Sequence, residues 1–191
     1  MFMLIVLLAL NFGVSWLNCW AVGGVWIESK ALGGFPRVLA WCGAIQAAIG
    51  FSSVIGFVLG AIALQLGVLP KSAASGAAGL WYLLIIVPAL GTGLVITIQS
   101  WLVAFRERSL VNMGVAAYNT LAQAHNMAGA VRGVGDAFGA VSSLFSRDDD
   151  DHAVAMLAIA LVVMALAGGA VLAAFLIRRY AGRVPLPGGE S

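Results

Sequence analysis

Residues 153 to 177 read AVAMLAIALVVMALAGGAVLAAFLI, a run without a single charged side chain. An α-helix of roughly 20 residues is long enough to cross the ~30 Å hydrocarbon core of a bilayer. Three other stretches, residues 1 to 27, 38 to 70 and 72 to 105, also contain no Asp, Glu, Lys or Arg. The sequence therefore predicts an all-α integral membrane protein with four transmembrane helices.

The composition agrees with this fold class. Hydrophobic residues make up 62% of the chain and charged residues 9%, whereas about a quarter of the residues in soluble domains are charged. The apolar runs are continuous instead of alternating, which excludes membrane-spanning β-strands. The net charge of +2 and the lack of basic clusters interleaved with aromatics argue against a nucleic-acid partner. Membrane lipid is the expected surrounding, and the inner (plasma) membrane is the expected location.

The first apolar stretch is predicted to be a true helix and not a cleaved signal peptide. It has no basic residues at its start and no small-residue cleavage motif, and its apolar run is longer than that of a signal peptide. Cys19 and Cys42 both fall inside predicted helices, so they are expected to pack as small apolar residues and not to form a disulfide.

Four regions are predicted along the chain. Residues 1 to 104 form a three-helix transmembrane region. It has a turn-rich connector at 28 to 37, where Gly33, Gly34 and Pro36 are predicted to break the helix, and a small, flexible connector at 67 to 79. Residues 105 to 152 form an amphipathic extramembrane or interfacial connector. Residues 153 to 177 form the fourth transmembrane helix, and residues 178 to 191 a disordered basic and Pro/Gly tail.

The long connector contains an uncharged segment, residues 109 to 131, that has two faces when drawn as a helix. One face carries Asn112, Asn119 and Asn126 at seven-residue spacing, and the opposite face is apolar. Such a helix would lie in the membrane interface, dock a partner through its asparagines, or enter the membrane as a re-entrant or fifth crossing segment.

Membrane orientation depends on which of these alternatives holds. With four crossings, six basic residues lie on one side, and four, Lys71 and the C-terminal Arg178, Arg179 and Arg183, lie on the other. This is a weak positive-inside bias. With four crossings, the arginines after the third helix and those at the C-terminus lie on opposite sides, although both groups favour the cytoplasmic side. A fifth crossing within 109 to 131 would place both groups on the same side.

Polar side chains in the first helix raise a separate question. Asn11, Ser15 and Asn18 share one narrow stripe, at relative angles of about 0°, 40° and 340° for a rotation of 100° per residue. Within lipid such a stripe must face protein or water. The first interpretation is hydrogen bonding to neighbouring helices. The alternative is a hydrated path, to which Gln99 of the third helix would contribute.

Small residues at four-residue spacing predict close helix packing. The predicted packing residues are Ala40, Ala44, Ala48, Ser52, Gly56 and Gly60 in the second helix and Ala165, Gly169 and Ala173 in the fourth.

No catalytic, cofactor-binding or metal-binding residue is predicted. The predicted helices contain no ionisable residue, and GVGD at 133 to 136 lacks the second intramembrane aspartate that a protease dyad requires. The acidic run at 148 to 151, followed by His152, lacks the spacing of a calcium loop and is predicted to be solvated. His125 has no ligand-type residue at a suitable spacing.

These observations lead to one functional expectation with two alternatives. The chain is expected to be a non-catalytic membrane subunit that oligomerises with itself or with other membrane proteins, in a secretion, conjugation or phage-related assembly. The alternatives are a homo-oligomeric channel or holin-like pore and, third, a subunit of a membrane enzyme.

Overall fold

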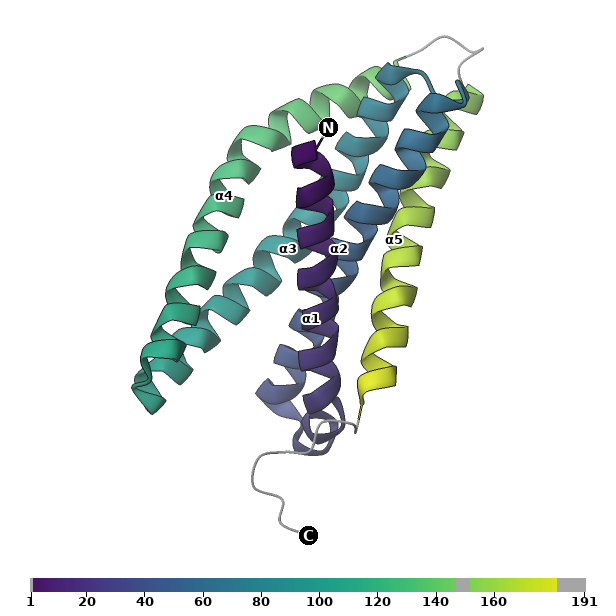
Figure 1. Cartoon of the computed structure of the whole chain (residues 1–191). Coiled ribbons are helices and arrows are strands. Elements are labelled where there is room, and N and C mark those ends of the chain that lie inside the picture. The colour runs from purple at the N-terminus through teal and green to yellow at the C-terminus, as the bar shows by residue number, and fades with distance from the viewer. Residues whose placement is uncertain (1, 147–151, 182–191) are drawn as a thin grey trace. The chain divides into compact units, whose positions relative to one another are not determined.

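The computed structural model describes residues 2 to 146 and 152 to 181, and all regular structure in these ranges is helical. The helices are α1 (Phe2–Leu32), α2 (Gly34–Gln65), α3 (Lys71–Glu107), α4 (Leu110–Phe145) and α5 (His152–Tyr180) (Figure 1). All except α4 are long and apolar enough to cross a membrane. The predicted all-α class is confirmed, and so are four helices of membrane-spanning length and composition.

The chain divides into two compact units. The terminal unit comprises Met1–Ile55 and Leu166–Ser191, and the central unit comprises Gly56–Ala165. Both α2 and α5 contribute residues to each unit. The acidic run at 148 to 151 and the tail from 182 onward lie outside the described residues.

The turn between α1 and α2 is much shorter than the predicted connector at 28 to 37. Both Gly33 and Gly34 have positive φ, 64° and 52°, a conformation that costs glycine little because it lacks a Cβ. Pro36 does not break the helix, because it falls in the first turn of α2, where backbone N–H groups have no intrahelical acceptor. The helical ends therefore meet at a turn centred on Gly33.

The predicted flexible connector at 67 to 79 is also shorter. The chain turns at Gly67, with φ of 69°, and α3 begins at Lys71. Gly76 and Gly79 lie inside α3 and face α4: a methyl group on Gly79 would lie 2.8 Å from the carbonyl oxygen of Ala137. Small residues here allow close helix packing where the sequence suggested flexibility.

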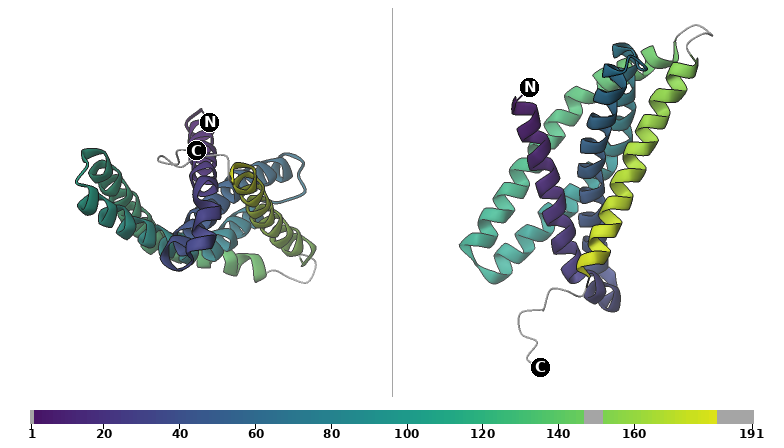
Figure 2. Two further views of the ribbon diagram at one scale, coloured as in Figure 1. Left: turned by 90° about the horizontal axis from the view of Figure 1, so that it is seen from below. Right: turned by 45° about the vertical axis from the view of Figure 1, so that its right-hand side comes forward.

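Within the central unit, α3 and α4 form an antiparallel hairpin, whose two arms lie side by side in Figures 1 and 2. The reversal occurs at Arg108, which adopts a left-handed conformation with φ of 49°. The helix predicted within 109 to 131 is thus part of a 36-residue helix. Its buried residues recur every seven positions: Ala116, Gln123, Ala130, Ala137 and Leu144.

In the terminal unit, α1, the first part of α2 and the end of α5 share a core. Phe51 is fully buried, and Leu176 and Ile177 pack in the same cluster. The end of α5 lies beside the α1–α2 turn (Figure 2). Here Gly23 approaches α5 so closely that a methyl group on it would lie 2.5 Å from Cβ of Tyr180. Gly23 belongs to the last third of α1, so the final turn of α5 packs beside this part of α1, toward the α1–α2 turn.

Candidate functional site

The polar stripe of α1 is joined to α2 by hydrogen bonds. Nδ2 of Asn11 donates to the carbonyl oxygen of Gly50 at 3.4 Å and to the hydroxyl of Ser53 at 2.5 Å. Ser15 is buried, and its hydroxyl donates to the carbonyl oxygen of Asn11 at 2.8 Å. Asn18 is partly buried. Two of the three predicted stripe residues thus make bonds within the chain.

Gly50 allows this contact between α1 and α2. A Cβ on Gly50 would overlap Oγ of Ser15 and lie 3.1 Å from Oδ1 of Asn11. Because Gly50 has no side chain, α1 and α2 can approach each other closely at Asn11 and Ser15. Gln99, which was predicted to share a lining with the stripe, belongs to α3 and to the central unit, where it is partly buried.

The small residues of α2 and α5 face each other within the terminal unit. A methyl group on Gly169 would lie 2.5 Å from the carbonyl oxygen of Ala48 and 2.6 Å from the amide nitrogen of Ser52. Ala40, Ala44 and Ala173 are buried in the same core.

The remaining predicted packing residues belong to the central unit. There Gly56 lies against Ala165, whose Cβ would be 3.3 Å from a methyl group on Gly56. Ala165 itself is 2% exposed. In contrast, a methyl group on Gly60 would meet nothing within 4 Å. Close packing therefore involves most of the predicted row but not its last member.

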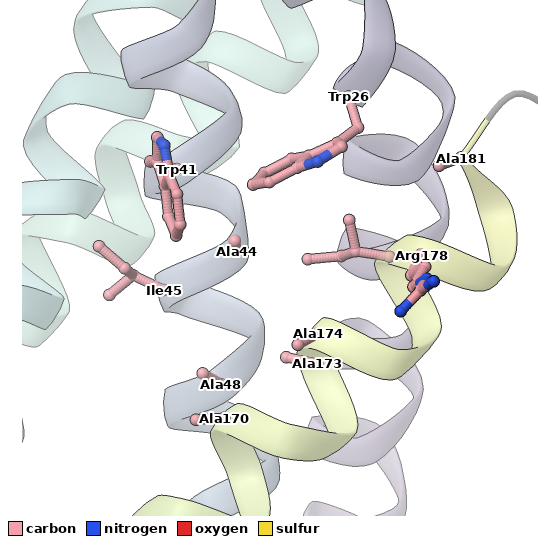
Figure 3. A pocket seen from close by; sticks show the side chains of 11 residues that line it. Trp26, Trp41, Ala44, Ile45, Ala48, Ala170, Ala173, Ala174, Arg178 and Ala181 are labelled. Carbon is pink, nitrogen blue, oxygen red and sulfur yellow. The ribbon is translucent and has the colours of Figure 1, made fainter. Parts of the chain in front are cut away.

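A groove of about 500 Å³ opens between α1, α2 and α5 of the terminal unit (Figure 3). Alanines form much of its wall, among them Ala44 and Ala48 from α2 and Ala170 and Ala174 from α5. Its volume is within the range of small-molecule sites, and its wall is apolar. Nothing in the sequence analysis singled out this groove, because its walls come from three separate helices.

Aromatic and basic side chains gather at one end of the groove. Trp26 and Trp41 meet edge to face, with ring centroids 5.2 Å apart. The guanidinium carbon of Arg37 lies 4.0 Å from the Trp26 ring centroid and 5.4 Å from that of Trp41. Nη1 of Arg37 also donates to the carbonyl oxygen of Trp26 and the hydroxyl of Ser29, each at 3.4 Å. Arg178 of α5 completes this end of the wall.

The sequence contains a signal for this end of the groove. Trp26 and Trp41 flank the turn between α1 and α2, and Arg37 stands between them in sequence. An antiparallel turn places such residues at one level, where a cation and two aromatic rings can stack. The contribution of Arg178 could not be inferred without the position of α5.

Polar groups also join the two arms of the α3–α4 hairpin. Gln123 is 7% exposed, and its Nε2 donates to the carbonyl oxygen of Leu90 at 2.9 Å. Nearer the hairpin turn, Nε1 of Trp101 donates to the hydroxyl of Thr120 at 2.8 Å. Nearer the other end, the hydroxyl of Tyr82 donates to a carbonyl oxygen of α4 at 3.3 Å. These bonds join residues 82 to 101 of α3 to residues 120 to 129 of α4, and the role of Gln123 in this contact was not predicted from the sequence.

The predicted asparagine row flanks the buried seam of α4. Asn112 donates to a carboxylate oxygen of Glu107 at 2.6 Å, close to the hairpin turn. The backbone carbonyl of Asn119 accepts from the hydroxyl of Thr97 at 3.4 Å. Asn126 is exposed.

The apolar face of α4 points away from α3. It carries an exposed column of residues at seven-residue spacing: Leu110, Ala117, Ala124, Val131, Phe138 and Phe145. Leu110 and Val131 are more than four-fifths exposed. This column, called the outer column below, is accompanied by Gly135 and Gly139, where an added methyl group would meet nothing within 4 Å.

The described residues contain no group of three or more His, Cys, Asp or Glu side chains placed to hold a metal ion. Cys19 and Cys42 are buried free thiols, and His125 is exposed on α4.

The chain matches no family model, and no curated protein or solved structure is significantly similar to it.

Proposed function

We propose that the chain is a plasma-membrane protein with five membrane crossings, α4 supplying the fifth. In the terminal unit, the end of α5 packs against the last third of α1, toward the α1–α2 turn. If α1, α2 and α5 each cross the membrane, α5 must start on the side where α2 ends. Since α3 is also of spanning length and composition, α4 must bring the chain back.

The sequence of α4 is compatible with a crossing beside α3. Residues 110 to 131 are uncharged, and as a helix they span about 33 Å. Gln123, the buried polar residue of this part, is hydrogen bonded to α3, which reduces the cost of placing it in hydrocarbon.

Five crossings also give a clear charge asymmetry. One side then holds Lys30, Arg37, Arg106, Arg108, Arg178 and Arg179, and the described part of the opposite side holds Lys71 and Arg132. Because basic residues are enriched in cytoplasmic loops, the side with six is the cytoplasmic side. With five crossings, the arginines near the turn between α3 and α4 and those at the end of α5 lie on the same side of the membrane.

Single cysteines labelled with a membrane-impermeant maleimide test this path. In a variant in which Cys19 and Cys42 are replaced by alanine, cysteines at Leu32 and Ala181 should label from the same side, and a cysteine at Ser146 from the opposite side. Labelling of positions 32 and 181 from opposite sides would contradict the fifth crossing.

Within that membrane placement, we propose that the protein is a non-catalytic subunit that assembles through α4. The outer column of α4 carries the proposal. Its apolar residues repeat every seven positions, as in helix pairs, and beyond the crossing segment the open Gly135 and Gly139 leave room for close approach of a second helix.

The contacts inside the chain favour this role over a pore lining. Asn11, Ser15 and Gln123 donate hydrogen bonds to other groups of the chain, so these side chains are engaged in packing. By contrast, the small residues of α4 beside the outer column are open. Assembly through α4 uses the surface that internal packing leaves uncovered.

The mass of the native complex tests the subunit role. Extracted from its source membrane in polymer nanodiscs, the chain of 19.7 kDa should be found in a larger complex. Gly139→Leu should reduce that mass, whereas Gly91→Leu, at an equally open glycine of α3, should not. A monomeric wild type would contradict assembly, and a pure homo-oligomer that conducts ions would indicate a pore instead.

A further inference from the structure

The groove between α1, α2 and α5 has an apolar wall and a cationic end. Ala170 of α5 and Ala181, the residue after α5, both line it and are eleven positions apart, which corresponds to about 16 Å along the helix axis. At one end the wall is built from Ala48 and Ala170, and at the other from Trp26, Trp41 and Arg178 (Figure 3). The groove thus follows the helices from an apolar level to a level with aromatic and basic groups.

All charged residues in the described part of the terminal unit lie at this second level. The basic residues are Lys30 at the end of α1, Arg37 at the start of α2, and Arg178 and Arg179 at the end of α5. The single acidic residue is Glu28. This end therefore has a net positive charge, and it attracts anions.

Arg37 does not line the groove itself, but it contacts two side chains that do. Arg37 stacks on Trp26, lies near Trp41, and bonds through Nη1 to groups of α1. Such stacking uses the face of a guanidinium and holds it at the level of the rings, while the N–H groups at its edge can still donate hydrogen bonds. Arg178 is exposed and lines the wall from the opposite helix.

We propose that this groove binds one anionic phospholipid, with an acyl chain against the alanine wall and the phosphate at Arg178, at the end where Arg37 adds positive charge. An acyl chain fits an apolar wall without hydrogen-bonding requirements, and tryptophan is the side chain typical of the headgroup level. Basic pockets between transmembrane helices on the cytoplasmic side bind anionic headgroups. The proposal depends on the membrane placement proposed above, but not on the subunit role.

The charge decides which ligand is favoured. A soluble phosphate would use the positive end and leave the alanine wall bare. A zwitterionic lipid would bring its own cationic headgroup to an end that is already positive. An anionic phospholipid complements both parts of the groove.

Native mass spectrometry of the purified chain, released from nanodiscs of defined composition, tests the proposal. Wild-type protein from discs with equal phosphatidylglycerol and phosphatidylcholine should retain one phosphatidylglycerol in preference. Arg178→Gln should lower the retained fraction about fivefold, and Arg179→Gln, which changes the neighbouring arginine outside the wall, should change it less than about twofold.

The acyl part is tested separately. Ala174→Leu places a larger side chain in the groove and should lower retention of both lipids, whereas Ala167→Leu, at an exposed position of α5 outside the wall, should not. Added glycerol 3-phosphate should not displace the bound lipid.

Three results would overturn the proposal: equal retention of the two lipids by wild type, equal effects of the two arginine substitutions, or no effect of Ala174→Leu. Displacement by glycerol 3-phosphate would indicate a site for a soluble phosphate instead. Since retention is measured on the isolated chain, loss of assembly through α4 does not affect the result, and the labelling experiment tests the membrane path independently.

Discussion

Replacing Gly50 by alanine should weaken the contact between α1 and α2. The added Cβ would overlap Oγ of Ser15 and lie 3.1 Å from Oδ1 of Asn11 and 3.2 Å from Cβ of Ser15. Neither neighbour can move away freely, because Ser15 is buried and Asn11 is bonded to Ser53. The helices must separate, or the polar pair must change its rotamers.

The expected cost follows from three contributions. Overpacking of a tight contact costs about 1–3 kcal/mol. The two bonds from Asn11 contribute roughly 0.6 kcal/mol each, the average for interhelical bonds in membranes. Replacing a helical glycine by alanine stabilises the helix by about 1 kcal/mol, which offsets part of this loss. The Gly50→Ala variant should therefore be less stable than wild type by about 1–3 kcal/mol.

Reversible unfolding in bicelles by steric trapping measures this difference. The matched control is Gly60→Ala on the same helix, where an added methyl group meets nothing within 4 Å and no loss of stability is expected. Combining Gly50→Ala with Ser15→Ala removes the overlapping oxygen and should restore part of the stability. Equal stability of the Gly50→Ala and Gly60→Ala variants would refute the proposed close contact.

Three further predictions concern other helix contacts. Gly169→Leu should lower the midpoint of thermal unfolding of the protein in nanodiscs, because the leucine side chain would clash with the backbone of α2 near Ser52. An unchanged midpoint would mean that α5 does not pack against α2 at this position. Gln123→Leu should cost about 0.6–1.7 kcal/mol and increase amide hydrogen exchange in the α3–α4 hairpin, since the bond to α3 is lost; wild-type exchange would argue against that bond. Trp101→Phe and Thr120→Val should each destabilise the protein by about 0.6 kcal/mol, because each removes the same hydrogen bond. The double variant should therefore lose no more stability than either single variant, and additive losses would show that the two side chains do not interact.

Part of the α1–α2 contact could be predicted from the spacing of polar residues. Asn11 and Ser15 share a stripe, and polar groups in an apolar helix favour protein contacts. Their acceptors could not be predicted, because serine and glycine occur at many positions of α2. Gly50 lies outside the predicted row of small residues, yet it is the glycine that the polar pair contacts.

The connectors show a different limit of sequence-based prediction. Gly33 and Pro36 both suggested a break between α1 and α2, but proline in the first helical turn is tolerated. Residues 67 to 79 suggested flexibility because most of them are small and Lys71 is their single charged residue. The same composition permits close packing once α4 lies alongside, so the local sequence alone does not distinguish the two outcomes.

The sequence by itself determined the helical class and the length and apolar composition of four helices, because these depend on runs of neighbouring residues. It also marked two faces on the segment that became α4. Only the tertiary structure decided that the polar side of α4 borders its contact with α3, that the end of α5 lies beside the α1–α2 turn, and that three helices enclose a groove with Arg178 in its wall. These features depend on pairing between distant segments, and many of the residues involved are alanines and glycines, whose small side chains are compatible with several partners.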